Sequence, residues 1–134
     1  MSNAPKLPKE ISTAMQDYKP ATRTALIKVR DLLFEAAREN PAIGPITETL
    51  KWGQPSYLTE QTKSGSTVRL GETGGDNYPA IFVNCKTTLI AQFKEHYGNQ
   101  LDYIGVRALV ITDVELRAEI KHCLALVLTY HARK

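Results

Sequence analysis

The spacing of apolar residues in the first third of the chain predicts two helices. Ile11, Met15 and Tyr18 recur at helical intervals, and this short pattern stops at 19–20 because proline disfavours helix in the residue before it. A longer apolar face runs from about 21 to 39 and ends where a proline follows an asparagine. The breadth of this second face predicts a helix that is covered on more than one side.

The same spacing predicts two further helices in the second half of the chain. Leu89, Phe93 and Tyr97 share one face of a short helix, which a threonine can cap at its start and Gly98 can end. The last helix is predicted to begin at the capping box Thr-Asp-Val-Glu over 112–115. Apolar residues at 116, 120, 123, 124, 127 and 128 then mark its buried face.

Between these helices the chain changes to short segments that glycine and proline separate, which is typical of strands. Segments 46–52, 56–60, 67–71 and 79–85 have no crossover helices between them, so they predict an antiparallel meander. Segment 104–111 is apolar on both faces except at Arg107 and predicts a central strand. The resulting order, ααββββαβα, is that of an α+β fold in which an antiparallel β-sheet packs against helices.

Composition places the chain among globular domains with one hydrophobic core. It has 134 residues, of which 43% are hydrophobic and 23% charged, and a formal net charge of +3. We therefore expect a single domain over 1–134, with 1–8 disordered. No stretch is apolar for the roughly 18 residues that a membrane helix needs, and two cysteines are too few for a disulfide framework. These observations favour a cytoplasmic protein without a membrane partner.

Residues of the types that bind metals or act as nucleophiles show no recognised motif. The three histidines and two cysteines lack the spacing of a zinc site, and the neighbours His122 and Cys123 point about 100° apart on a helix. No serine lies in a nucleophile elbow, and the glycine-rich loop over 71–75 lacks the lysine of a phosphate-binding loop. The sequence therefore assigns no catalytic residue and no cofactor.

The most informative cluster is Leu-Lys-Trp-Gly-Gln-Pro-Ser-Tyr, which contains the only tryptophan and ends at Tyr57. Gly53 and Pro55 predict a sharp bend between strands, and such a bend can line a pocket with Trp52. Strand alternation places Arg107 on an apolar face, so its charge needs a partner or an opening to solvent. Two interpretations stay open. Arg107 stacks on Trp52 or forms a salt bridge at the end of the sheet, or it binds an anionic ligand.

A basic face with interleaved aromatic residues would bind nucleic acid if the strands brought its members together. Its candidate members are Lys51, Trp52, Tyr57, Lys63, Arg69 and Lys86. Because the net charge is only +3, the sequence favours the alternative that these lysines are scattered and solvated.

Several segments resemble the YdhG-like family, a group of small bacterial proteins with a domain of unknown function. The resemblance begins at Lys-Trp-Gly-Gln-Pro-Ser-Tyr over 51–57 and continues in Phe-Val-Asn-Cys-Lys-Thr-Thr-Leu over 82–89, Arg-Ala at 107–108 and Leu-Thr-Tyr-His over 128–131. It implies a compact α+β domain with an antiparallel sheet. Some members of the family are described as frataxin-like iron chaperones, which implies an iron carrier that uses surface carboxylates.

The leading functional hypothesis is a non-enzymatic protein that binds a small anionic or polar ligand, or a partner. Its predicted site consists of Trp52, Gly53, Pro55, Tyr57 and Arg107. The second hypothesis is an iron carrier with Glu35 and Glu39, one helical turn apart, as candidate ligands, although a solvated helix face explains this pair better. The remaining hypotheses are an enzyme whose site forms only in the folded chain, and a homodimer joined through helix faces.

Overall fold

The structure, a computed structural model, describes residues 4–133 and has an α+β fold. Its helices are α1 (Lys9–Ala14), α2 (Pro20–Glu39), α3 (Leu89–Tyr97) and α4 (Arg117–Leu128), with a 3₁₀ turn, η1, at Gly98–Gln100. Its strands are β1 (Thr47–Lys51), β2 (Gln54–Leu58), β3 (Val68–Glu72), β4 (Pro79–Phe82), β5 (Asp102–Ile104) and β6 (Ala108–Val110). They form one antiparallel sheet in the order β1-β2-β3-β4-β6-β5. The predicted fold class is confirmed.

The sheet has one strand more than the sequence pattern predicts. Segment 104–111, expected as a single central strand, contains the end of β5, a turn over 105–107 and the whole of β6. Gly105 permits the reversal because it adopts a φ of +52°, which favours glycine. Arg107 therefore lies exposed in a turn, and its predicted place on the apolar face of a strand is wrong.

The last helix begins later than its predicted capping box. Asp113 Oδ1 accepts a hydrogen bond from the backbone N–H of Glu115 at 3.0 Å, which closes a local turn instead of a helix end. The hydroxyl of Thr112 donates to Asp102 Oδ2 on β5 at 2.9 Å. Because the side chains of Thr112 and Asp113 make these hydrogen bonds and do not cap a helix, the segment is a loop and α4 starts at Arg117.

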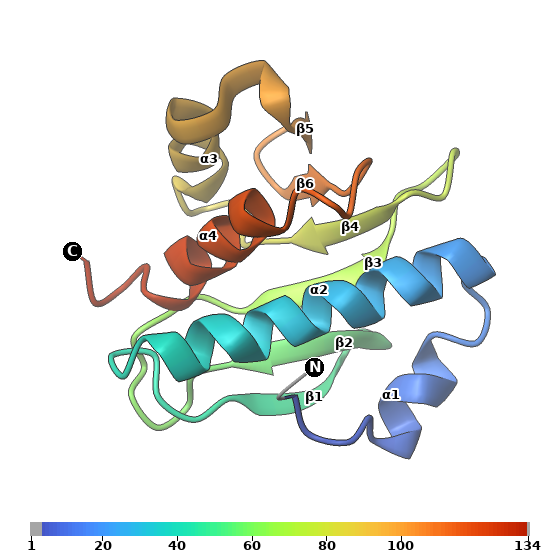
Figure 1. Ribbon diagram of the computed structural model, residues 1–134, viewed down its shortest axis with the longest axis horizontal. Coiled ribbons are helices and arrows are strands. Elements are labelled where there is room, and N and C mark those ends of the chain that lie inside the picture. Colours follow the sequence, from blue (N-terminus) through green and yellow to red (C-terminus); the bar gives the residue numbers. More distant parts are fainter. Residues whose placement is uncertain (1–3, 134) are drawn as a thin grey trace.

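In the described part of the chain, the helices cover one face of the sheet and leave the other without a helix. α2 and α4 lie across the same side (Figure 1), and buried residues of α1 and α3 join the core there. Directly paired residues on neighbouring antiparallel strands point to the same face. The register therefore defines the opposite side, which we call the outer face. Its central part consists of Thr49, Lys51, Gln54, Ser56, Arg69, Gly71, Ala80, Phe82, Ala108 and Val110.

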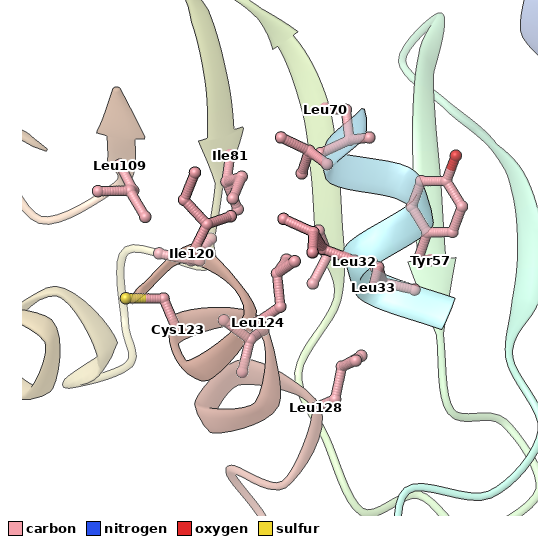
Figure 2. Packing of buried hydrophobic residues seen from close by; sticks show 14 of the residues in the cluster. Leu32, Leu33, Tyr57, Leu70, Ile81, Leu109, Ile120, Cys123, Leu124 and Leu128 are labelled. Carbon is pink, nitrogen blue, oxygen red and sulfur yellow. The ribbon is translucent and has the colours of Figure 1, made fainter. Parts of the chain in front are cut away.

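The core lies between the inner face of the sheet and the two longest helices. Figure 2 shows Leu32 and Leu33 of α2 and Leu124 of α4 gathered over Leu70 and Ile81 of the sheet, and all five side chains are buried. Burying an aliphatic side chain of this size contributes about 1.5–3 kcal/mol. These contacts therefore fix both helices on the inner face, and the outer face plays no part in holding them.

One cluster of buried residues reaches from Ile11 to Leu128, in agreement with a single hydrophobic core. Disorder is predicted over 1–8, of which residues 1–3 lie outside the described residues. Leu7, however, packs partly buried against the core, so the packed chain begins before α1. No helix within residues 4–133 combines the length and the apolarity that crossing a membrane requires.

Candidate functional site

The turn between β1 and β2 holds Trp52 in a strained and exposed position. The register pairs Lys51 with Gln54, so Trp52 and Gly53 alone form the turn, with φ values of +51° and +72°. Two-residue turns of this kind favour asparagine, aspartate or glycine at the first position, because a bulky side chain is strained at positive φ. Trp52 is nevertheless 83% exposed, so packing into the core does not compensate for the strain.

Arg69, in the middle of the outer face, lies between two aromatic rings. Its Cζ atom is 5.3 Å from the ring centroid of Trp52 and 5.9 Å from that of Phe82. Its Nη1 donates a hydrogen bond to Oε1 of Gln54 at 3.0 Å. A Cβ atom at Gly71 would come within 2.4 Å of the side-chain nitrogen of Gln54. The glycine therefore leaves room for the amide that positions the guanidinium group.

A cavity of about 300 Å³ opens beside the tryptophan ring, and we call it the Trp52 groove. It is lined by Lys51, Trp52, Thr67, Arg69, Asn84 and Cys85. Two of the lining side chains are cations and none is a carboxylate, so the groove attracts anions. The exposed indole ring adds a flat surface for stacking next to these charges.

The five residues of the predicted site do not lie together. Trp52 and Gly53 form the exposed turn, whereas Pro55 and Tyr57 are buried on β2. Arg107 lies between β6 and β5, at the edge of the sheet opposite to the β1–β2 hairpin. A role of Arg107 in ligand binding stays a prediction, which a variant can test separately.

Tyr57 belongs to a buried polar cluster on the inner side of the sheet. Its hydroxyl donates to Glu48 Oε2 at 2.7 Å, and the same carboxylate accepts two bonds from the Arg30 guanidinium at 2.5 and 2.9 Å. The side chains of Arg30 and Glu48 are 4% and 9% exposed. Burial, reinforced by the bond to Glu48, raises the pKa of Tyr57. The cluster ties α2 to β1 and β2, and its paired groups make it structural.

The two carboxylates that are candidate iron ligands flank a lysine. Nζ of Lys121 lies 2.9 Å from Oε1 of Glu35 and 3.0 Å from Oε1 of Glu39. The hydrogen bond from Lys121 lowers the pKa of Glu35 below its ordinary value. A metal cation at this place would have to displace the ammonium group. Residues 4–133 contain no group of three or more His, Cys, Asp or Glu side chains that could hold a metal ion.

α3 and α4 meet at a cluster of two histidines and a tyrosine. The hydroxyl of Tyr97 and Nδ1 of His122 are 2.6 Å apart, and the ring centroids of His96 and His122 are 4.6 Å apart. Burial, which disfavours the charged imidazolium, lowers the pKa of His122. The adjacent Cys123 is buried, which raises the pKa of its thiol to about 12. The cluster therefore provides no activated thiolate at neutral pH.

The sequence names Arg69 only among the candidates for a basic face, and it does not mark Phe82 as a site residue. The arginine stacked on Trp52 is Arg69, whereas the sequence pointed to Arg107. The two-residue turn sets the register of β1 with β2 and so puts Lys51 and Gln54 on one face. Arg69 lies on the same face, where it donates to Gln54. The pairing of Arg69 with Phe82 depends on the register of the β3–β4 hairpin, whose loop is longer than a two-residue turn and does not fix that register by itself.

No protein-family model matches the chain, and no curated protein or solved structure matches it either. The resemblance to the YdhG-like family rests on the four segments quoted above and stays a prediction. Function is therefore inferred from the geometry of the Trp52 groove.

Proposed function

We propose that this is a non-enzymatic binding protein whose Trp52 groove takes a small ligand with a planar ring and an anionic group. The observation that carries the proposal is the conformation of Trp52. Strained backbone at a bulky residue clusters at binding and catalytic sites, where the strain is part of the function. A tryptophan that is both strained and 83% exposed adds little to stability, whereas its open ring suits stacking on a ligand.

The cations of the groove complete the recognition of such a ligand. A guanidinium group has five N–H donors, and Gln54 accepts from one of those of Arg69. The others suit the two oxygens of a carboxylate or phosphate. Because Arg69 is already held between two rings and an amide, little side-chain freedom is lost when an anion binds. We expect the ring of the ligand on Trp52 and its anionic group between Arg69 and Lys51.

Fluorescence of Trp52 measures this binding directly, because it is the only tryptophan in the chain. Its exposed ring should emit much as indole does in water, and a ring stacked upon it should quench the emission. Two ligand series separate the chemistry, nucleoside monophosphates and aromatic carboxylates. We expect saturable quenching by at least one series, and the absence of saturation in both would contradict the proposal.

Three arginine variants locate the site. Arg69→Gln should weaken binding roughly tenfold or more, because a hydrogen bond to a charged group contributes about 1.5–3 kcal/mol. Arg117→Gln removes an exposed arginine at the start of α4 and is the matched control that should bind normally. Arg107→Gln tests the prediction from the sequence. If that variant loses binding while Arg69→Gln keeps it, the site lies at the other edge of the sheet.

Recovery of the ligand distinguishes a carrier from an enzyme. A ligand that quenches Trp52 is incubated with the protein, separated and identified by mass spectrometry. A binding protein returns it unchanged, whereas a converted product that requires Arg69 would show that the groove is an active site.

A further inference from the structure

The groove is continuous with the open outer face of the sheet. Arg69 pairs directly with Phe82 on β4, whose side chain is half-buried and part of whose ring is therefore accessible. The neighbouring positions on this face, Gly71, Ala80 and Ala108, are small and buried, so Phe82 is the aromatic side chain next to Arg69 on β4 that a ligand can reach. The outer face therefore presents a second aromatic ring beyond the arginine.

We propose that the ligand of the groove is a single-stranded nucleic acid, with bases stacked on Trp52 and Phe82 and a phosphate held by Arg69 and Lys51. The inference rests on the proposed function and extends it from one stacked ring to two. Proteins that bind single strands without sequence preference combine aromatic rings for successive bases with cations for the backbone. Both elements occur on one open sheet face, with the guanidinium between the rings.

A second copy of the chain is the other occupant that an open sheet face can take. A two-fold symmetric dimer would bring the same face of both copies together. Lys51 and Arg69 of one copy would then approach the same cations of the other, and the groove lining contains no carboxylate to offset them. Charge complementarity therefore favours a polyanion over a second copy.

The low net charge of the chain does not contradict this inference, because the local field of the groove decides how an anion is attracted. Lys51, Trp52 and Arg69, which stand apart in the sequence, line one groove. Tyr57, another candidate from the sequence, is buried on the inner side. Two cations and two rings predict modest affinity with a shallow dependence on salt.

The decisive measurement compares thymidine monophosphate with thymidylate oligomers of about two, five and ten nucleotides, since single-strand sites span roughly 4–16 nucleotides. Quenching of Trp52 gives each affinity. We expect binding to tighten at least tenfold between the monomer and the oligomer of about five. For the longer oligomers, two phosphate contacts predict a slope of about −1.4 in log affinity against log salt. Lys51→Gln should make this slope shallower by about 0.7.

A variant that lacks the second ring distinguishes binding of a single-stranded oligomer from binding of one nucleotide. Phe82→Leu removes the ring but keeps most of the apolar volume, and should weaken the oligomers about tenfold. The monophosphate should weaken less, because it loses the contact that holds Arg69 against Phe82 but no stacked base. Tyr78→Leu, which alters an exposed aromatic residue in the β3–β4 loop, is the control. The salt slope of Lys51→Gln provides an independent test if the Phe82 variant folds poorly.

The outcomes distinguish the two proposals. If the monophosphate binds as tightly as the longest oligomer, the proposal of a single-stranded nucleic acid is wrong and the small-ligand proposal stands. If neither binds, the strand proposal is overturned, and the small-ligand proposal then depends on the aromatic carboxylates. The single-strand proposal would also be overturned if a duplex binds as tightly as the single strand. The same holds if neither Phe82→Leu nor Lys51→Gln changes the affinity for the oligomers.

Discussion

The loop between β2 and β3 packs its backbone directly against the end of α4. A Cβ atom at Gly65 would lie 2.4 Å from the carbonyl oxygen of Leu128 and 2.5 Å from its carbonyl carbon and Cα. Ser64 Oγ donates to the same carbonyl at 2.9 Å, and the backbone N–H of Ser66 donates to the carbonyl of Val127 at 2.9 Å. The glycine is thus required by the close approach of two backbones.

Gly65→Ala should lower the free energy of unfolding by about 1–3 kcal/mol, because backbone rather than a flexible side chain must move to admit the methyl group. Gly74→Ala is the matched control, since a Cβ there meets no atom within 4 Å, and it should change stability by less than about 0.5 kcal/mol. Urea unfolding followed by circular dichroism measures both. Equal midpoints for the two variants would show that the loop and helix separate freely.

The buried carboxylate of Glu48 should contribute more to stability than the half-exposed carboxylate of Glu35. Glu48→Gln leaves the Arg30 guanidinium buried without its counter-charge, which should cost about 3–5 kcal/mol of stability. Glu35→Gln weakens a pair with Lys121 near the surface and should cost about 1 kcal/mol or less. Unfolding in urea at neutral pH ranks them, and a Glu48 variant no less stable than the Glu35 variant would contradict the structural role of the cluster.

At the scale of elements, the contact between α3 and α4 should make stability depend on pH. The pKa of His122 is lowered in the fold from its ordinary value of 6.5, mainly by burial, with smaller effects of His96 and Arg133. The unfolded chain therefore binds a proton more readily, so stability is complete above about pH 6.5 and falls as the pH drops below it. His122→Gln should flatten this part of the profile, measured by urea unfolding between about pH 8 and pH 5. An unchanged profile would assign the dependence to other groups.

Two helices, α2 and α3, were predicted closely, because their apolar spacing is a local property of the chain. The predicted helix over 21–39 matches α2 almost to its ends, and the short helix ending at Tyr97 matches α3. The end of β5 and the whole of β6 were merged because Ile104 and β6 are apolar, and the three-residue turn between them has little in the sequence to mark it apart from one glycine. The part of the site at Trp52 and Gly53 could be predicted from the sequence, because the glycine and the following proline indicate a bend there. Arg69 was named only as a member of a possible basic face, because its contact with Trp52 depends on the pairing of β2 with β3, which the local pattern does not fix.

At the scale of the whole molecule, the core and the proposed binding site lie on opposite faces of one sheet. The inner face carries the core and both long helices, as Figures 1 and 2 show. The outer face carries the strained turn and the stacked arginine. This division explains why a bulky residue at positive φ is tolerated there. Its strain affects a turn at the edge of the sheet and not the packing that holds the helices.

The contact between α2 and α4 has a consequence for how the chain is made. Ile120, Leu124 and Leu128 cover the inner face next to a helix that ends at Glu39, so the two halves of the core are synthesised far apart in time. A growing chain emerges from the ribosome with its earlier segments first. Until residue 128 is free of the ribosome, α4 cannot cover the apolar surface of α2 and the sheet. Each newly made molecule thus passes through an interval in which the inner face of the sheet lacks the cover of its own last helix.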